Sequence, residues 1–199
     1  MNQDIFQEGI KYLLSVETKF KKLVPKEKIK FFLRPSGFEG ICSLVIEQQI
    51  SVAAAESIKN KVFHLMGSVC SSEFIDLEES LLRGAGLSRP KINYLKGIAE
   101  HEISGKLEFN KINAMDDGEA CEYLCRLKGI GNWTADCYLM ACLGRQDIWP
   151  IGDIGLQEGV RKLKNLRERP DINEMVAMAD DWRPYRSVAA NLLWRDYDE

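Results

Sequence analysis

Long apolar runs are absent from this sequence. The apolar runs are short, and residues 41–46, for example, are followed directly by a charged residue. A helix that spans a bilayer needs about 20 predominantly apolar residues, so we predict no membrane span. The first residues, Met1-Asn2-Gln3-Asp4, also lack the basic start and apolar core of a secretory signal. We therefore expect a cytoplasmic protein.

Cysteine pairs of the C-x-x-C kind are also absent. The cysteines are Cys42, Cys70, Cys121, Cys125, Cys137 and Cys142. In a cytoplasmic chain such thiols are more often reduced than paired in disulfides. The close spacing of Cys121 with Cys125, and of Cys137 with Cys142, leaves a metal site open as an alternative. Both pairs lie in apolar helical patterns, however, where small buried thiols are commoner, so we expect no metal cluster.

An excess of positive charge is missing too, since the net charge is −3 and the isoelectric point is about 5.6. This counts mildly against a protein that holds DNA by bulk charge alone. Basic residues still gather in two clusters, which fit a solvated helix face equally well. The clusters are Lys19, Lys21, Lys22, Lys26, Lys28, Lys30 and Arg34, and then Arg161, Lys162, Lys164, Arg167 and Arg169.

Strand-like alternation is scarce and helical periodicity dominates. Ser51 is typical of a helix N-cap, as is Ser88 shortly before Pro90. Asp116 followed by Glu119 resembles a capping box. No low-complexity linker and no internal repeat divides the chain. The sequence therefore predicts an all-α protein of about eight to eleven helices.

The most informative stretch is residues 127–135, Leu-Lys-Gly-Ile-Gly-Asn-Trp-Thr-Ala, between two helical patterns. Gly129 and Gly131 predict a tight, unobstructed turn, because glycine tolerates a positive φ and has no Cβ. The second helix begins directly, so its first N–H groups point out of the turn and suit a phosphate oxygen. Ile130 can anchor the turn in the core. A plain corner between two helices explains this short pattern equally well.

One acidic residue follows in residues 149–157, Trp-Pro-Ile-Gly-Asp-Ile-Gly-Leu-Gln. Pro150 and Gly152 enforce a bend, and apolar residues surround Asp153 at the start of another helical pattern. Asp153 can be an ordinary N-cap. It can also be a carboxylate that stabilises a developing positive charge on a substrate. Local spacing does not decide between the two interpretations.

Taken together, the Gly-Ile-Gly turn and the Pro-Ile-Gly-Asp run resemble the pattern of the helix-hairpin-helix (HhH-GPD) DNA glycosylase superfamily. Within it the chain is similar to the 3-methyladenine DNA glycosylase II (AlkA-like) branch, over residues 38–194. Further similar segments are residues 38–54, residues 81–99 with Gly84, Gly86, Lys91 and Tyr94, and residues 182–194. The resemblance implies an all-α fold, with two helical lobes flanking a DNA-binding cleft.

The resemblance also implies the organisation of the chain. Residues 1–199 are expected to form a single HhH-GPD domain, with the hairpin at residues 127–132. The chain is expected to lack the N-terminal β-rich domain of larger members. The C-terminal region has no cysteine, so the iron–sulfur cluster of the endonuclease III branch is not expected.

By resemblance, Asp153 is the catalytic carboxylate and Trp133 and Trp194 line the base pocket. Strand-cleaving relatives have a lysine at the position of Trp133, and its amine forms a Schiff base. Tryptophan cannot do this, so the resemblance implies a monofunctional enzyme that leaves an abasic site. Cys137 and Gly152 depart from residues found in some relatives, which puts the substrate range in doubt.

The resemblance further implies a partner, double-stranded DNA with damaged bases, bound by a monomer. The residues expected to contact DNA are Gln48, Gln49, Ser51, Gly129, Ile130, Gly131 and Thr134. The backbone carbonyls of Cys125, Leu127 and Ile130 are expected to hold a monovalent cation. Two alternatives stay open: a glycosylase for deaminated or etheno bases, and a module that binds damaged DNA without chemistry.

Overall fold

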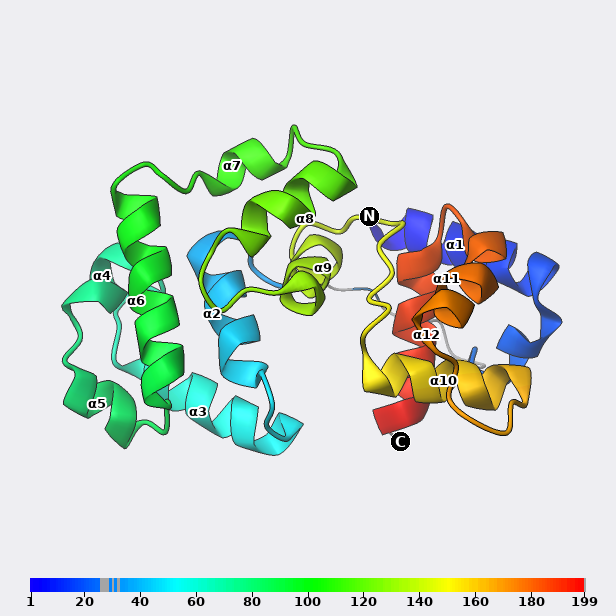
Figure 1. The fold of residues 1–199 in the computed structure, drawn as a ribbon, viewed down its shortest axis with the longest axis horizontal. Helices are drawn as coiled ribbons and strands as arrows, with labels where there is room; N and C mark the ends of the chain where they lie inside the picture. The colour runs from blue at the N-terminus through cyan, green and yellow to red at the C-terminus, as the bar shows by residue number, and fades with distance from the viewer. Residues whose placement is uncertain (26–28, 30, 32, 199) are drawn as a thin grey trace. The chain divides into compact units, whose positions relative to one another are not determined.

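The computed structural model describes residues 1–25, 29, 31 and 33–198. For residues 196–198 it describes the backbone only. These residues form helices and turns, with no strand among them (Figure 1). The prediction of an all-α protein is confirmed. Twelve α-helices occur among the described residues, more than the eight to eleven predicted. Three of them, α4, α5 and α7, have only four to six residues, too few to produce a recognisable period.

The helices in chain order are α1 (Gln3–Val16), η1 (Thr18–Lys22), α2 (Gly37–Glu47), α3 (Val52–His64), α4 (Ser71–Asp76), α5 (Glu79–Gly84), α6 (Arg89–Ile103), α7 (Phe109–Ile112), α8 (Asp117–Cys125), α9 (Asn132–Ala141), α10 (Ile154–Lys164), α11 (Ile172–Ala179), η2 (Asp180–Trp182) and α12 (Arg186–Asp198). Among the described residues, no helix is both long enough and apolar enough to cross a membrane.

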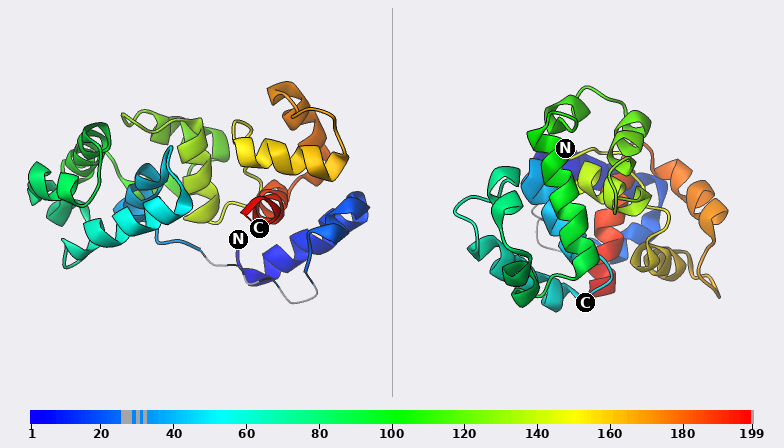
Figure 2. Two further views of the ribbon diagram at one scale, coloured as in Figure 1. Left: turned by 90° about the horizontal axis from the view of Figure 1, so that it is seen from below. Right: turned by 60° about the vertical axis from the view of Figure 1, so that its left-hand side comes forward.

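The chain divides into two compact units. The middle unit is Arg34–Tyr138, and the terminal unit combines Met1–Leu33 with Leu139–Glu199. In the terminal unit, α1 and α12 therefore come from opposite ends of the sequence and pack side by side (Figures 1 and 2).

In the terminal unit, α12 supplies much of the core, and α1 and α10 pack on it. A Cβ at Gly159 would lie 3.0 Å from the Cβ of Leu193, so glycine lets α10 approach α12 closely. Trp182 is fully buried, with the ring centroids of Phe20 at 5.1 Å and Trp149 at 5.4 Å. Edge-to-face rings of this kind stabilise a core beyond the area that they bury.

In the middle unit, α2 is the central helix and is buried along most of its length. Helices α3 and α6 pack on α2, and α4 packs along α6. Ile92, Leu95 and Ile98 form the buried face of α6 and are at most 1% exposed. This buried face belongs to a helix that packs on both α2 and α4.

Local start signals in the sequence predicted several helix ends in the middle unit. Ser51 caps α3 by accepting a hydrogen bond from Ala54, and Asp116 with Glu119 forms a capping box at α8. Ser88 is the N-cap residue of α6, although its side chain makes no capping hydrogen bond. These starts are confirmed because capping depends only on residues within one turn of the helix.

Candidate functional site

The hairpin between α8 and α9 is a tight turn with a positive φ at its first glycine, as the sequence predicted. Gly129 has a φ of +89°, and a Cβ there would lie 2.3 Å from the ring of Tyr94, so this position requires glycine. Ile130 is 5% exposed and anchors the turn, as predicted. Gly131 is exposed, and no described atom lies within 4 Å of a Cβ built on it. The first N–H groups of a helix have no partner within it, so the exposed start of α9 offers donors to a ligand.

A second turn, residues 48–51, links α2 to α3. Gln49 adopts a φ of +57° and is exposed. The left-handed region costs a residue with a Cβ about 1 kcal/mol, so the surrounding contacts must hold it there. Ile50 and Val52 beside it are 38% and 77% exposed. The turn thus presents one amide and two apolar side chains to solvent.

The side chain of Gln48 joins this turn to the hairpin. Its Nε2 donates to the carbonyl of Gly129 and to Oγ1 of Thr134, both at 3.0 Å. Thr134 is only 3% exposed, so its hydroxyl lies inside the unit. Both residues were predicted to contact DNA, and their side chains lie where they support the turns. A DNA contact by either residue stays a prediction.

Trp133 lies half-buried in the first turn of α9, and Cys137 lies buried one turn further on. On the preceding helix, burial and then the charge of Asp136 raise the pKa of Cys121 to about 12. Its thiol is therefore protonated at neutral pH. No group of three or more His, Cys, Asp or Glu among the described residues is placed to hold a metal ion.

The carbonyls expected to hold a monovalent cation belong to the same hairpin. The carbonyl of Leu127 accepts the N–H of Ile130 at 3.0 Å. A carbonyl oxygen has two lone pairs, so this bond leaves Leu127 able to contact a cation as well. The oxygens suit a hard cation, and the cation stays a prediction.

Asp153, in the terminal unit, is the N-cap of α10. Its Oδ1 accepts the backbone N–H of Leu156 at 2.7 Å and the indole N–H of Trp194 at 2.9 Å. The N-cap interpretation left open above is therefore correct, and it does not compete with a catalytic role. A carboxylate held by two donors at the positive end of a helix is fixed in position, as stabilisation of a developing charge requires.

Trp194 was predicted to line a base pocket. In the structure its indole N–H, in the C-terminal half of α12, donates to Oδ1 of Asp153. Trp194 as a whole is half-buried. The residue can therefore orient the carboxylate, and its stacking on a base stays a prediction.

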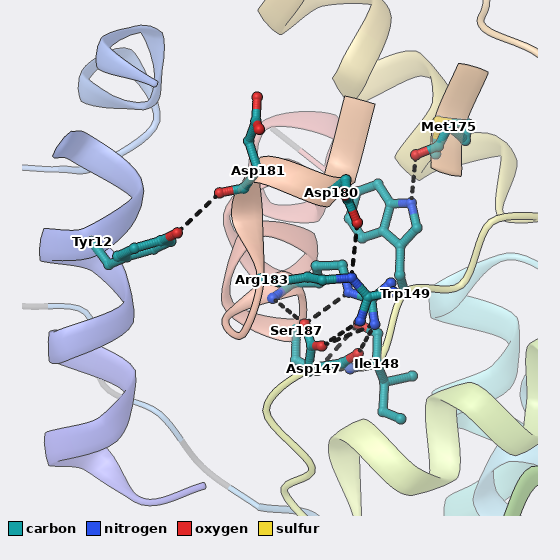
Figure 3. A network of polar contacts seen from close by, with 10 residues as sticks. Tyr12, Asp147, Ile148, Trp149, Met175, Asp180, Asp181, Arg183 and Ser187 are labelled. Atoms are coloured by element: carbon teal, nitrogen blue, oxygen red, sulfur yellow. Dashed lines mark hydrogen bonds and ion pairs between the residues drawn. The ribbon is translucent and has the colours of Figure 1, made fainter. Parts of the chain in front are cut away.

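The segment that leads to Asp153 is fastened to the start of α12 (Figure 3). Asp147 accepts from Arg186 at 2.7 Å and from Arg183 at 2.9 Å. Ser187 accepts the N–H of Ile148 at 2.9 Å, and Trp149 donates its indole N–H to the carbonyl of Met175 at 3.1 Å. Residues 147–149, directly before Pro150, are thus each held by a hydrogen bond. These bonds limit the movement of the bend that carries Asp153.

We expect Arg186→Met to destabilise the terminal unit. The side chains of Arg186 and Asp147 are only 16% and 19% exposed, so the substitution leaves a poorly solvated carboxylate with one partner fewer. A loss of about 2 kcal/mol in the free energy of unfolding follows from such a change. Urea unfolding followed by circular dichroism measures it. Arg89→Met removes an exposed ion pair with Glu79 and is the control, expected to change little.

Several residues of the two basic clusters form ion pairs. Arg161 and Arg169 contact Glu158 at 2.7 and 3.6 Å, and Lys164 contacts Glu17 at 2.6 Å. Arg34 contacts Glu47 at 2.8 Å. For these four residues the ion pairs fit the interpretation as a solvated helix face. Three members of the first cluster lie outside the described residues: Lys26, Lys28 and Lys30.

Sequence reasoning assigned no role to several residues that hold the site together. Asp147, Arg186 and Ser187 fasten the segment before Asp153, and Lys91 and Tyr94 contact the two turns of the middle unit. Asp147 and Arg186 are 39 positions apart, and no local pattern links them. Lys91 and Tyr94 were noticed only as part of a similar segment.

The chain is similar to known DNA repair proteins. A family model described as "HhH-GPD superfamily base excision DNA repair protein" matches residues 42–184. The DNA-3-methyladenine glycosylase of Bacillus subtilis is 30% identical over 81% of this chain and 57% of its own length. DNA-3-methyladenine glycosylase 1 of Schizosaccharomyces pombe is 30% identical, over 79% of this chain and 71% of its own length.

Among solved structures, a 3-methyladenine DNA glycosylase of Schizosaccharomyces pombe in complex with abasic DNA superposes with a TM-score of 0.88. The identity is 26%, and the match covers 96% of this chain and 97% of that one. The chain therefore belongs to the HhH-GPD superfamily of base excision DNA repair proteins. The resemblance to the 3-methyladenine glycosylase branch is confirmed by these relatives. The chain spans little more than half the length of the Bacillus relative.

Proposed function

We propose that this chain is a monofunctional DNA glycosylase, which flips and excises alkylated purines of the 3-methyladenine type from double-stranded DNA. The observation that carries the proposal is the carboxylate of Asp153, held by Leu156 and Trp194 at the start of α10. Capping of α10 accounts for the bond from Leu156, whereas the second donor, the indole of Trp194, is not needed for a cap. The names of the relatives support the choice of lesion.

Charge development in the reaction explains the role of the carboxylate. As the N-glycosidic bond breaks, the sugar acquires oxocarbenium character, and the bonding electrons leave with the base. A fixed carboxylate next to the sugar stabilises that positive charge, and it can orient or deprotonate the water that completes hydrolysis. An alkylated purine often carries a positive charge and is then a good leaving group. Free base and an abasic site are the products.

The two turns of the middle unit suit the DNA-binding steps. The exposed Gly131 and the first N–H groups of α9 fit a phosphate of the backbone, whatever the sequence. Gln49, with Ile50 and Val52 beside it, fits the gap that a flipped nucleotide leaves. Polar and apolar side chains that enter a base stack are a known means of opening a duplex.

The experiment that tests the proposal is release of free 3-methyladenine and 7-methylguanine from methylated duplex DNA, measured by chromatography. We expect release under multiple-turnover conditions. Duplexes with a deaminated or an etheno base are run in parallel. Release from those alone would move the substrate to the other lesion classes, and release from none would reject a glycosylase activity.

The product distinguishes a monofunctional from a strand-cleaving enzyme. Because position 133 is tryptophan and not lysine, we expect no Schiff base and no borohydride-trapped complex. The DNA strand should stay intact after base release and break only when alkali is added. Strand breaks without alkali, measured on a denaturing gel, would contradict this part of the proposal.

Trp194→Phe tests whether the indole nitrogen supports the reaction. Phenylalanine keeps an aromatic ring but cannot donate to Asp153. We expect the single-turnover rate of base release to fall about tenfold, the effect of one lost hydrogen bond to a charged group. Affinity for abasic DNA should not change. If Trp194 acts only by stacking on the base, Trp194→Phe keeps its rate while Trp194→Leu loses it.

The remaining expectations belong to the same proposal. The partner is double-stranded DNA with damaged bases, bound by a monomer without an iron–sulfur cluster. The protein acts in the cytoplasm, and at the nucleoid if the source is prokaryotic. A monovalent cation held by the carbonyls of Cys125, Leu127 and Ile130 would neutralise part of the charge of a nearby phosphate.

A further inference from the structure

We propose that Lys91 is a positioning residue, which holds the turn of Gln49 in the conformation that enters DNA and fixes this turn relative to the hairpin. The inference rests on the proposed function, because that function gives the two turns their DNA-binding roles. Four side chains carry it, and all belong to the middle unit: Lys91, Tyr94, Gln48 and Gln49.

The ammonium group of Lys91 lies at the end of α2. Its Nζ donates to the carbonyls of Ile46 and Gln48, both at 2.8 Å. The last carbonyls of a helix have no partner within the helix, and a cation there also interacts favourably with the helix dipole. Lys91 therefore stabilises the end of α2 one residue before the left-handed Gln49.

The conformation of Gln49 needs such support. A chain that leaves a helix in the left-handed region usually has glycine at that point. Here the residue is glutamine, with a φ of +57° and an exposed side chain. Glycine could relax to other conformations, whereas glutamine presents an amide that can replace the contacts of a missing nucleotide. Lys91 thus permits a functional side chain where helix geometry favours glycine.

The same face of α6 contacts the hairpin. Tyr94 lies one turn after Lys91, and its ring packs on Gly129 so closely that a Cβ there would be 2.3 Å away. Gln48 in turn donates to the carbonyl of Gly129 at 3.0 Å. The contacts form a closed circuit from Lys91 to Gln48, to Gly129, to Tyr94 and back along α6. Both turns are thereby held by residues of the same helix, α6.

Burial of the ammonium group is consistent with a dedicated contact. Lys91 is half-buried, and this burial lowers the pKa of its amine. The long side chain thus leaves water in part, and its two carbonyl partners replace water as acceptors. A lysine that served only solubility would keep its ammonium group in the solvent.

The chain offers a matched control on the same helix. Lys96 donates its Nζ to the carbonyls of Ile75 and Leu77, at 3.2 and 3.0 Å, at the end of α4. The chemistry is the same as that of Lys91, but the helix end that it stabilises belongs to neither turn. Lys96→Met therefore reports the cost of losing a lysine that caps a helix, without an effect on the turns.

The test compares Lys91→Met and Lys96→Met with the wild type in binding two duplexes, one undamaged and one containing a stable abasic-site analogue. We expect Lys91→Met to weaken binding to the abasic duplex about tenfold and to leave binding to the undamaged duplex within about twofold. Lys96→Met should change neither. A 2-aminopurine base opposite the abasic site should fluoresce less with Lys91→Met, since the turn no longer disturbs the stack.

Equal weakening of both duplexes by Lys91→Met, or weakening of neither, would overturn the proposal. If Lys91→Met does not fold, Lys91→Gln keeps an uncharged N–H donor group and is expected to show a smaller loss in the same direction. Hydrogen–deuterium exchange without DNA separates this inference from the proposed function. Faster exchange of the amides in the last turn of α2, residues 44–47, in Lys91→Met but not in Lys96→Met supports it even if no methylated base is released, and unchanged exchange rejects it.

Discussion

Asp153→Asn should abolish base release while leaving the fold and DNA binding intact. We expect the single-turnover rate to fall at least about a hundredfold, because the charge that stabilises the oxocarbenium-like sugar is lost. Asparagine is as good an N-cap as aspartate, so its side-chain oxygen can still accept from Leu156 and Trp194. The substitution therefore removes the charge and keeps the hydrogen bonds. Affinity for abasic DNA should stay equal or rise, since a negative charge near phosphates disappears.

A matched control isolates the charge of Asp153 from capping in general. Asp171 caps α11 in the same unit and accepts from Glu174 at 2.9 Å. Asp171→Asn should release methylated bases at the wild-type rate. If Asp153→Asn also turns over near the wild-type rate, then Asp153 is only a structural cap and the catalytic assignment is wrong.

Gly129→Ala should have the second largest effect, because it damages the hairpin and the packing behind it together. The backbone of Gly129 has a φ of +89°, which L residues rarely adopt, and the new Cβ would overlap the ring of Tyr94. We expect the free energy of unfolding to fall by about 2 kcal/mol or more, from backbone strain and overpacking. DNA affinity should fall at least about tenfold at a temperature where the variant is still folded.

Gly131→Val separates the DNA contact from the fold. Since no described atom lies near a Cβ at Gly131, thermal unfolding should be close to that of the wild type. The side chain would nevertheless stand where a phosphate approaches the first N–H groups of α9. Binding should weaken alike for every DNA sequence, in fluorescence anisotropy titrations. A loss that depends on sequence would contradict a grip on the backbone.

Local chemistry explains what the sequence predicted well. The caps of α3 and α8, the buried Ile130 and the positive φ of Gly129 depend on residues within a few positions of each other. Glycine is strongly preferred at a positive φ, and serine and aspartate are strongly preferred as N-caps. The same holds for Asp153 as an N-cap, where the sequence named the residue but could not choose between two roles.

Contacts between distant residues explain what the sequence could not predict. Trp194 and Asp153 are 41 positions apart, and Lys91 lies 43 positions from Gln48. Nothing in either neighbourhood shows that one side chain will donate to the other, because the packing of whole helices brings them together. For the same reason the sequence did not show that the buried hydroxyl of Thr134 accepts from Gln48, and the contact of Thr134 with DNA stays a prediction.

The division of the chain has a consequence for synthesis on the ribosome. The terminal unit is made of the first and the last segments, and α1 packs on α12. Helix α1 therefore emerges before α12, and its apolar face has no α12 to cover it until residues 186–198 have been synthesised. The middle unit, whose residues are continuous in sequence, can be assembled in the meantime. Contacts across so many residues are slow to form, so docking of α1 should be a late event in folding.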